Sequence, residues 1–190
     1  MKRFFLFMIM GFFLLFNYSY GEVGIKYIGN GAGGQLSFAV TDVDGGAFGF
    51  GFHGIMEIAV EKIGVFQLNP SICFWFNSSK TNKLSKIYYR QISLNIFDAK
   101  YLFPVPKSIF VRPYCGGGLC ILVDGWEEEV LLQNGITVSN SDRNGSVGFN
   151  FYGGIDLPVS TVFIPYFETR FTAGDIWVFR LTMGCTFRFH

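Results

Sequence analysis

Three stretches of the chain combine residue types found in binding or catalytic sites, and the first is GNGAGG at residues 29–34. This stretch matches G-x-G-x-x-G, a pattern that binds a dinucleotide when a helix follows, because the N-terminus of that helix receives the pyrophosphate. The residues that follow, Gln35 to Val40, alternate between polar and apolar as a strand does. We therefore interpret these glycines as a kink or bulge within a strand.

The second stretch is CGGGLC at residues 115–120, which lacks the second Cys/His pair that a zinc site requires. We interpret it as a glycine-rich strand and expect neither a metal nor a cofactor. The chain has four cysteines, Cys73, Cys115, Cys120 and Cys185. An even count in an exported protein permits disulfides. We favour free thiols, because the strand pattern puts these residues on different faces of strands that are not neighbours.

The third candidate is His53, because His190 is the only other histidine in the chain. If residues 47–60 form a strand, His53 and Glu57 share a face but lie about 13 Å apart along it, too far for a hydrogen bond. No serine completes a triad with them in an obvious way. We therefore interpret His53 as a member of a buried polar network and expect a protein that is not an enzyme.

The elements that must position these residues are strands. From Glu22 onward, polar and apolar residues alternate with a period of two, and turn residues interrupt the alternation. Eight segments result, near residues 23–40, 47–60, 64–77, 86–101, 108–122, 146–157, 160–172 and 176–190. Asn69-Pro70 shifts the phase of the third segment and predicts a bulge there. Tight links follow the even segments and mostly longer ones follow the odd segments, which indicates antiparallel up-and-down order.

The apolar face of these strands is predicted to point outward. Only 15% of the residues are charged, whereas a soluble barrel needs a charged surface, about a quarter to a third of its exposed residues. The polar faces consist largely of Gly, Ser, Thr, Asn and Gln, which suit a narrow interior. We predict an all-β fold, an eight-stranded antiparallel up-and-down transmembrane β-barrel. Its last strand would face lipid through Trp177, Phe179, Leu181, Met183, Cys185, Phe187 and Phe189.

The few long charged residues on the polar faces come in both signs, and buried charges are tolerable when they are paired. We expect a polar network in the lumen made of Glu57, Glu61, Arg112, Asp156, Glu168, Arg170, Arg180 and Arg188. Within it, Glu168 and Arg170 lie on the strand beside that of Arg180 and Arg188, so cross-strand pairs between these two strands are sterically reasonable. Such a filled interior would not conduct solutes. The alternative architecture is a secreted soluble carrier of the lipocalin kind, with its apolar face inside.

The N-terminus predicts export. Residues 1–21 combine Lys2 and Arg3, an uncharged apolar core and a small-x-small site before Glu22, the features of a cleaved secretory signal peptide. Residues 22–190 then form one barrel domain. Removing Lys2 and Arg3 from the 15 basic residues leaves 13, against 14 acidic residues. Because this balance offers no basic surface, no nucleic-acid partner is expected.

Together, the signal peptide, the eight alternating segments and a final strand ending in aromatic residues resemble the small outer-membrane β-barrel proteins of the OmpA/OmpX type. The resemblance implies location in the cell outer membrane, contact with outer-membrane lipid, and recognition of the last strand by the barrel-assembly machinery. In this chain His190 follows Phe189, where the family pattern ends in Phe. Some such barrels are lipid A-modifying enzymes, which makes that activity, through His53, the rival to a structural or adhesion-like surface role.

The link at residues 123–145 is the longest and carries more apolar residues than a simple loop needs. We expect the strands on either side of it to continue as a hairpin beyond the membrane, with Asn134-Gly135 as its tight turn. The apolar side chains that would contact a protein or host-surface partner are Trp126, Leu131, Leu132 and Ile136. Exposed strand edges of this kind pair readily with other chains.

Overall fold

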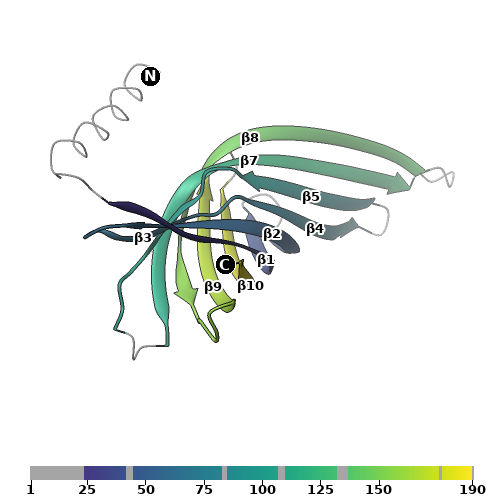
Figure 1. Ribbon diagram of the computed structural model, residues 1–190. Coiled ribbons are helices and arrows are strands. Elements are labelled where there is room, and N and C mark those ends of the chain that lie inside the picture. The colour runs from purple at the N-terminus through teal and green to yellow at the C-terminus, as the bar shows by residue number, and fades with distance from the viewer. Residues whose placement is uncertain are drawn as a thin grey trace, which may run out of the picture.

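The computed structural model describes residues 24–41, 45–82, 85–106, 110–131, 137–175 and 177–189. These residues form one antiparallel sheet of ten strands that curves into a barrel (Figure 1). The strands are β1 (Ile25–Thr41), β2 (Gly45–Val60), β3 (Gly64–Leu68), β4 (Ser71–Asn82), β5 (Ser85–Asn95), β6 (Ala99–Leu102), β7 (Arg112–Leu131), β8 (Thr137–Asp156), β9 (Phe163–Ala173) and β10 (Val178–Phe189). The predicted signal peptide and His190 lie outside the described residues.

The barrel closes where the first strand pairs with the last. β1 and β10 are antiparallel from Asn30↔Phe189 to Thr41↔Val178. β3 and β4 lie end to end beside β2, and β5 and β6 lie end to end beside β7. Each of these two pairs makes one stave, so the ten strands form eight staves in chain order around the ring. The predicted eight-stranded antiparallel up-and-down barrel is confirmed.

Two neighbouring staves are interrupted at the same level of the barrel. The third breaks at Asn69-Pro70, as the phase shift predicts, because proline has no N–H to donate to the sheet. The fourth breaks at residues 96–98, an interruption that the sequence pattern did not reveal. The Asn69 N–H donates to the Asp98 carbonyl oxygen at 2.8 Å, which ties the two breaks together. The second break also shifts the alternation of side chains: up to Asn95 the odd-numbered residues point inward, and from Asp98 the even-numbered residues do.

Side chains on the two faces of the sheet differ as predicted. Large apolar side chains stand on the outer face, where Phe48 is 75% exposed and Phe151 61%. The inner face is closely packed, and Trp75, Leu122 and Asn150 are almost completely buried. Among the described residues there is no helix long and apolar enough to cross a lipid bilayer.

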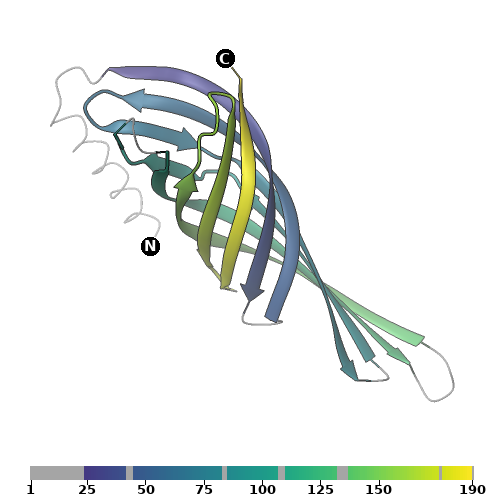
Figure 2. The same ribbon diagram turned by 90° about the horizontal axis from the view of Figure 1, so that it is seen from below.

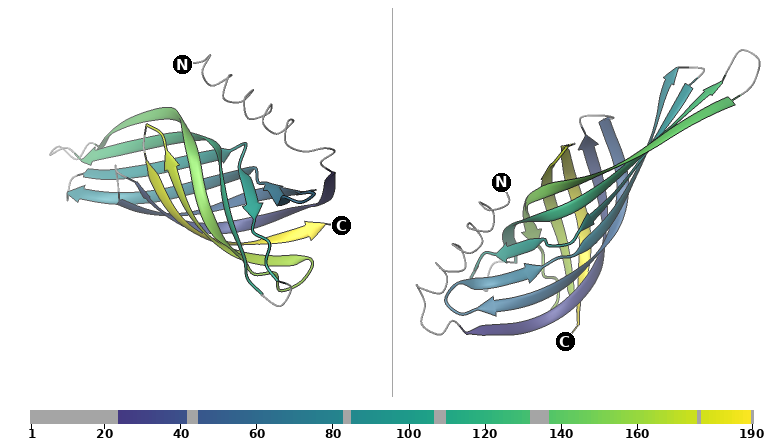
Figure 3. Two further views of the ribbon diagram at one scale, coloured as in Figure 1. Left: turned by 90° about the vertical axis from the view of Figure 1, so that its left-hand side faces the viewer. Right: turned by 90° about the horizontal axis from the view of Figure 1, so that it is seen from above.

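Two hairpins run well beyond the rest of the barrel. Figures 2 and 3 show β4, β5, β7 and β8 continuing together past the neighbouring β1–β2 hairpin. The register extends to Lys80↔Lys86 in one hairpin and to Leu131↔Thr137 in the other, and Ser85↔Val130 joins them. We call residues 77–82, 85–90, 125–131 and 137–144 the extension. The predicted continuation of the long link is therefore confirmed, although Asn134-Gly135 lies outside the described residues.

The link at residues 77–85, which we expected to be a loop, is mostly strand. Its residues up to Asn82 belong to β4, and Ser85 begins β5. The reason is tertiary, because β5 gains a partner in the long β7 and thereby supports β4 in turn.

The glycines of GNGAGG belong to β1, and Gly33 allows the interior to pack close to the wall. A Cβ atom at Gly33 would overlap the carbonyl oxygen of Cys185 on β10 and lie 2.6 Å from Cε1 of His53. The backbone of β10 cannot retreat without weakening the pairing that closes the barrel. By contrast, a Cβ atom at Gly145 on β8 would meet no atom within 4 Å.

We predict that Gly33→Ala destabilises the folded barrel by about 1–3 kcal/mol, the usual cost of overpacking. Gly145→Ala is the matched control and should leave the free energy of unfolding almost unchanged. Urea unfolding of both variants in lipid vesicles, followed by tryptophan fluorescence, measures the difference. Equal stability of the two variants would contradict this account of the closing seam.

Candidate functional site

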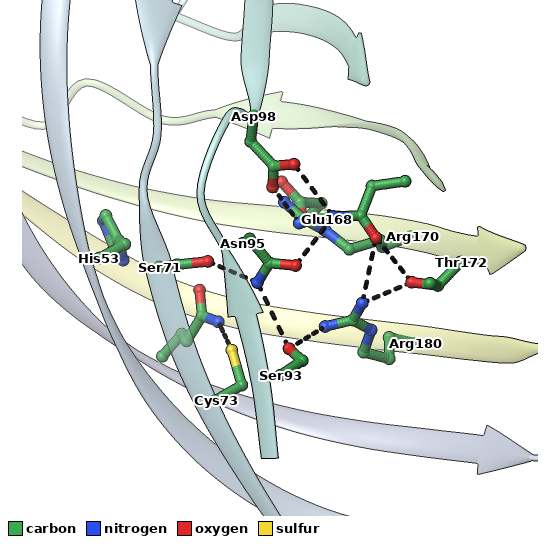
Figure 4. A network of polar contacts seen from close by, with 12 residues as sticks. His53, Ser71, Cys73, Ser93, Asn95, Asp98, Glu168, Arg170, Thr172 and Arg180 are labelled. Carbon is green, nitrogen blue, oxygen red and sulfur yellow. Dashed lines mark hydrogen bonds and ion pairs between the residues drawn. The ribbon is translucent and has the colours of Figure 1, made fainter. Parts of the chain in front are cut away.

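The interior of the barrel holds buried charges, and its centre is an ion-pair cluster around Arg170. The Nε of Arg170 on β9 lies 2.8 Å from Oε1 of Glu168, and Nη1 forms an ion pair with Asp98. Its guanidinium also lies 4.2 Å from the ring centre of Tyr152. Figure 4 shows Arg170 between the two carboxylates. One cation thus pairs with two buried anions, which lowers the cost of keeping all three charges out of water.

Asparagine and serine side chains continue the network from this cluster. Asn150 donates through Nδ2 to Oδ1 of Asp98 at 3.0 Å and to Oδ1 of Asn95 at 2.8 Å. Asn95 in turn donates to Oγ of Ser71 at 2.8 Å and to Oγ of Ser93 at 3.4 Å (Figure 4). These bonds connect β8 with β4 and β5 through the middle of the lumen.

Arg180 on β10 is held by neutral groups. Its guanidinium donates to Oγ1 of Thr172 at 2.6 Å, to Oγ of Ser93 at 3.3 Å and to Oδ1 of Asn150 at 3.4 Å. It also lies 4.9 Å from the ring of Trp75, within cation–π range. The described residues place no carboxylate in ion-pair contact with Arg180.

Nearer the tight-turn end, two further clusters seal the interior. Asp156 accepts from Nζ of Lys100 at 2.8 Å and from Nη2 of Arg112 at 3.1 Å. Arg188 forms an ion pair with Glu57 on β2, and Gln67 donates to the same carboxylate. The carboxylates in both clusters are almost fully buried.

The structure corrects two expectations about these charges. Glu61 is not in the lumen but exposed in the turn between β2 and β3, because β2 ends at Val60. Glu168 and Arg170 do not pair with Arg180 and Arg188, since Arg170 turns toward Asp98 and Arg188 reaches across to β2. The structure places the other expected lumen residues inside: Glu57, Arg112, Asp156, Glu168, Arg170, Arg180 and Arg188.

The sequence pattern missed Asp98 and Lys100, both buried charged members of the network. Asn95, Asp98 and Lys100 all point inward, which a regular alternation from Asn95 does not allow. The break between β5 and β6 inserts the extra residue that restores them to the inner face. The run Phe97-Asp98-Ala99-Lys100, with two charges of opposite sign near a phase change, was the available signal.

His53 lies in this polar interior with both ring nitrogens near hydroxyl groups. Nε2 is 2.8 Å from Oγ1 of Thr186, and Nδ1 is 3.4 Å from the hydroxyl of Tyr166. Ser71 is the cross-strand neighbour of His53, but its hydroxyl accepts from Asn95. Among the described contacts, the ring nitrogens of His53 meet the hydroxyls of Thr186 and Tyr166 and not that of Ser71.

The space left in the lumen around His53 is small. The cavity lined by His53, Lys100, Tyr166 and Arg170, among others, has a volume of about 20 Å³, room for about one water molecule. A soluble carrier requires a ligand cavity of roughly 300–1,000 Å³. Within the described ranges, no group of three or more His, Cys, Asp or Glu residues could hold a metal ion. All four cysteines are free thiols.

The outer face carries the apolar residues of the last strand. Trp177, Phe179, Leu181, Met183, Phe187 and Phe189 are 43%, 38%, 50%, 55%, 46% and 59% exposed. In the extension, Trp126 is 38% exposed. Leu132 and Ile136 lie outside the described residues, and the structure describes the backbone of Leu131 alone.

We predict that Arg170→Met lowers the free energy of unfolding by about 3–5 kcal/mol, because it leaves Asp98 and Glu168 buried without their cation. Arg112→Met is the matched control: Asp156 keeps Lys100 as a partner, and Arg112 is partly exposed. We expect a loss of about 1 kcal/mol or less for that variant. Urea unfolding of both folded variants in vesicles measures the two losses. Similar losses would show that Arg170 is not the centre of the network.

Comparison with known proteins gives structural matches only. No family model and no curated protein matches the sequence. The crystal structure of Ail, the attachment invasion locus protein of Yersinia pestis, matches with a TM-score of 0.55 and 13% identity, covering 88% of this chain and 100% of Ail. Ail in complex with the heparin analogue sucrose octasulfate matches with a TM-score of 0.50 and 15% identity, covering 89% and 100%. A major outer membrane protein from Thermus thermophilus matches with a TM-score of 0.51 and 10% identity, covering 83% and 99%. The chain thus has the fold of small outer-membrane β-barrels.

Proposed function

We propose that this chain is an outer-membrane β-barrel protein in which the barrel is a sealed, non-conducting anchor and the extension is a surface for binding a partner. The observation that carries the proposal is the distribution of polarity. Apolar side chains cover the outside of a closed sheet, and buried ion pairs fill its inside. Lipid is the solvent that favours this arrangement. Apolar side chains on the outside contact the hydrocarbon, and closure of the barrel pairs the backbone groups that the hydrocarbon could not satisfy.

The height of the apolar surface supports a membrane location. On β7 the outward positions are apolar or small from Pro113 to Val123, which are ten residue steps apart. At about 3.4 Å per residue and a strand tilt near 40°, this span covers about 26 Å across a membrane. Outer-membrane barrels have an apolar band about 25 Å tall. In this arrangement the six outward residues of the last strand contact lipid.

Export and assembly complete the proposed path to the membrane. Residues 1–21 act as a cleaved signal peptide, and β10, ending at Phe189, is the strand that the barrel-assembly machinery recognises. The position of β10 supports its proposed recognition by the assembly machinery, because β10 pairs with β1 to close the ring. Until that pairing forms, both strands have a free edge that an assembly factor can bind.

The extension supports an interaction role. β8 begins to pair with β9 only at Phe149, so in the described structure its residues 137–148 have no strand partner on that side. Residues 137–145 are exposed throughout. Such a free edge can receive an extended segment of another protein. The similarly folded Ail is an attachment and invasion protein, crystallised with a heparin analogue, and a comparable adhesive role on a host surface is what we propose for the extension.

We predict that the full chain runs as a compact species on gels before boiling and as a slower one after boiling, and that it gives no steady channels in planar bilayers. The filled lumen and the 20 Å³ cavity are the physical reason for the second result. Stable channels of uniform conductance would contradict the sealed barrel. Recovery of the protein in the soluble fraction without detergent would contradict the membrane location.

We predict that trimming the extension abolishes adhesion and leaves the barrel folded. The register aligns Ser79, Ile87, Glu128 and Asn140 in one row across the four strands. Residues 80–86 and 129–139 can therefore each be replaced by Asn-Gly, which suits a two-residue hairpin turn. Bacteria displaying either chain at equal surface levels are compared for adhesion to cultured epithelial cells. Adhesion equal to that of the full chain, or none by the full chain, would contradict the interaction role.

A further inference from the structure

The outer face of β5, β7 and β8 changes character at one row of residues, whereas β4 places the apolar Phe76 beside Arg90. Ile92 on β5, Val123 on β7 and Gly145 on β8 form an apolar row. The next row toward the tip is Arg90, Gly125 and Arg143, because Arg90 pairs with Gly125 and Gly125 pairs with Arg143. Two arginines thus stand on the same face with a glycine between them, where the apolar surface ends.

The glycine leaves a hollow between the two arginine side chains. Neighbouring strands are about 4.8 Å apart, so the Cα atoms of Arg90 and Arg143 are separated by about 10 Å. A groove of about 360 Å³ lies there. It is lined by the two arginines, by Ile92, Val123 and Gly125, and also by Tyr88, Asp124, Trp126, Glu127, Ser141 and Asp142. A Cβ atom at Gly125 would lie 3.7 Å from Cγ of Arg143, so the arm of Arg143 borders this hollow.

Both guanidinium groups are available to a ligand. Arg90 and Arg143 are exposed, and neither has an ion-pair partner among the described residues. Three carboxylates also line the groove: Glu127 is on the same face, one row closer to the tip, and Asp124 and Asp142 alternate to the other face of the sheet. A phosphate bound between the arginines therefore has an anion on the tip side and the apolar residues Ile92 and Val123 on the barrel side.

We propose that this groove binds the phosphate of a membrane lipid headgroup, with the acyl chains lying on Ile92 and Val123. The inference rests on the proposed function, because it places the arginine row where the apolar band meets the headgroups. Arginine binds phosphate through paired N–H donors, and the two arms can contact one phosphate from opposite sides. The continuity of the groove with the apolar surface selects a lipid over a free anion.

The experiment uses the full chain in a non-ionic detergent, with phosphatidic acid or diacylglycerol of the same acyl chains as probes. Native mass spectrometry counts the lipid retained on the folded protein. We expect retention of one phosphatidic acid and only background diacylglycerol. The double variant Arg90→Gln/Arg143→Gln should retain phosphatidic acid about tenfold less or worse, because it loses charge-assisted hydrogen bonds. Gly125→Val keeps both charges but fills the hollow, and should lose retention similarly.

The matched control is Lys26→Gln/Lys62→Gln, which removes two exposed positive charges at the opposite end of the barrel and should bind as the unchanged chain does. Equal retention by the arginine double variant, or an equal loss in the control, would overturn the site. Displacement by millimolar inorganic phosphate would overturn the choice of a lipid. Heat-modifiable mobility is recorded for every variant, so failure of the barrel itself is distinguished from failure of this groove.

Discussion

The pairing of β1 with β10 is the constraint on which the rest of the structure depends. It closes the ring, and β8 has a neighbour on both sides from Phe149 to Asp156. Closure also fixes a narrow interior, so the wall must be thin where bulky groups face it. Gly33 serves this purpose at the closing seam, where a larger residue would collide with the backbone of β10 and with His53.

Closure explains why the interior is charged. An eight-stave barrel encloses only a space that side chains can fill, and here ion pairs and amide networks share it with buried apolar clusters such as the one around Trp75 and Leu122. Arg170 pairs with two carboxylates, and Asp156 pairs with two cations. Asp156 and Glu57 pair with cations on other strands, so the network links strands across the lumen.

Toward the tip of the extension, the same sheet has fewer strand neighbours. The four long strands leave the ring, so β8 has a free edge that water or a partner can satisfy. At the transition, the apolar row of Ile92 and Val123 gives way to Arg90 and Arg143 within a single pleat of each strand. The proposed anchor, the proposed boundary with the headgroups and the proposed interaction surface are thus successive levels of one continuous sheet.

By itself the sequence determined the eight staves, their antiparallel order and the outward apolar face, because period-two alternation and turn residues are local signals. It also identified most of the charged residues that line the lumen. Only the tertiary structure decided how these charges pair. The break at residues 96–98 brings Asp98 and Lys100 inside, and curvature carries Arg188 across to Glu57. Partners on distant strands leave no local pattern, so pairing across a closed barrel depends on its register and shape.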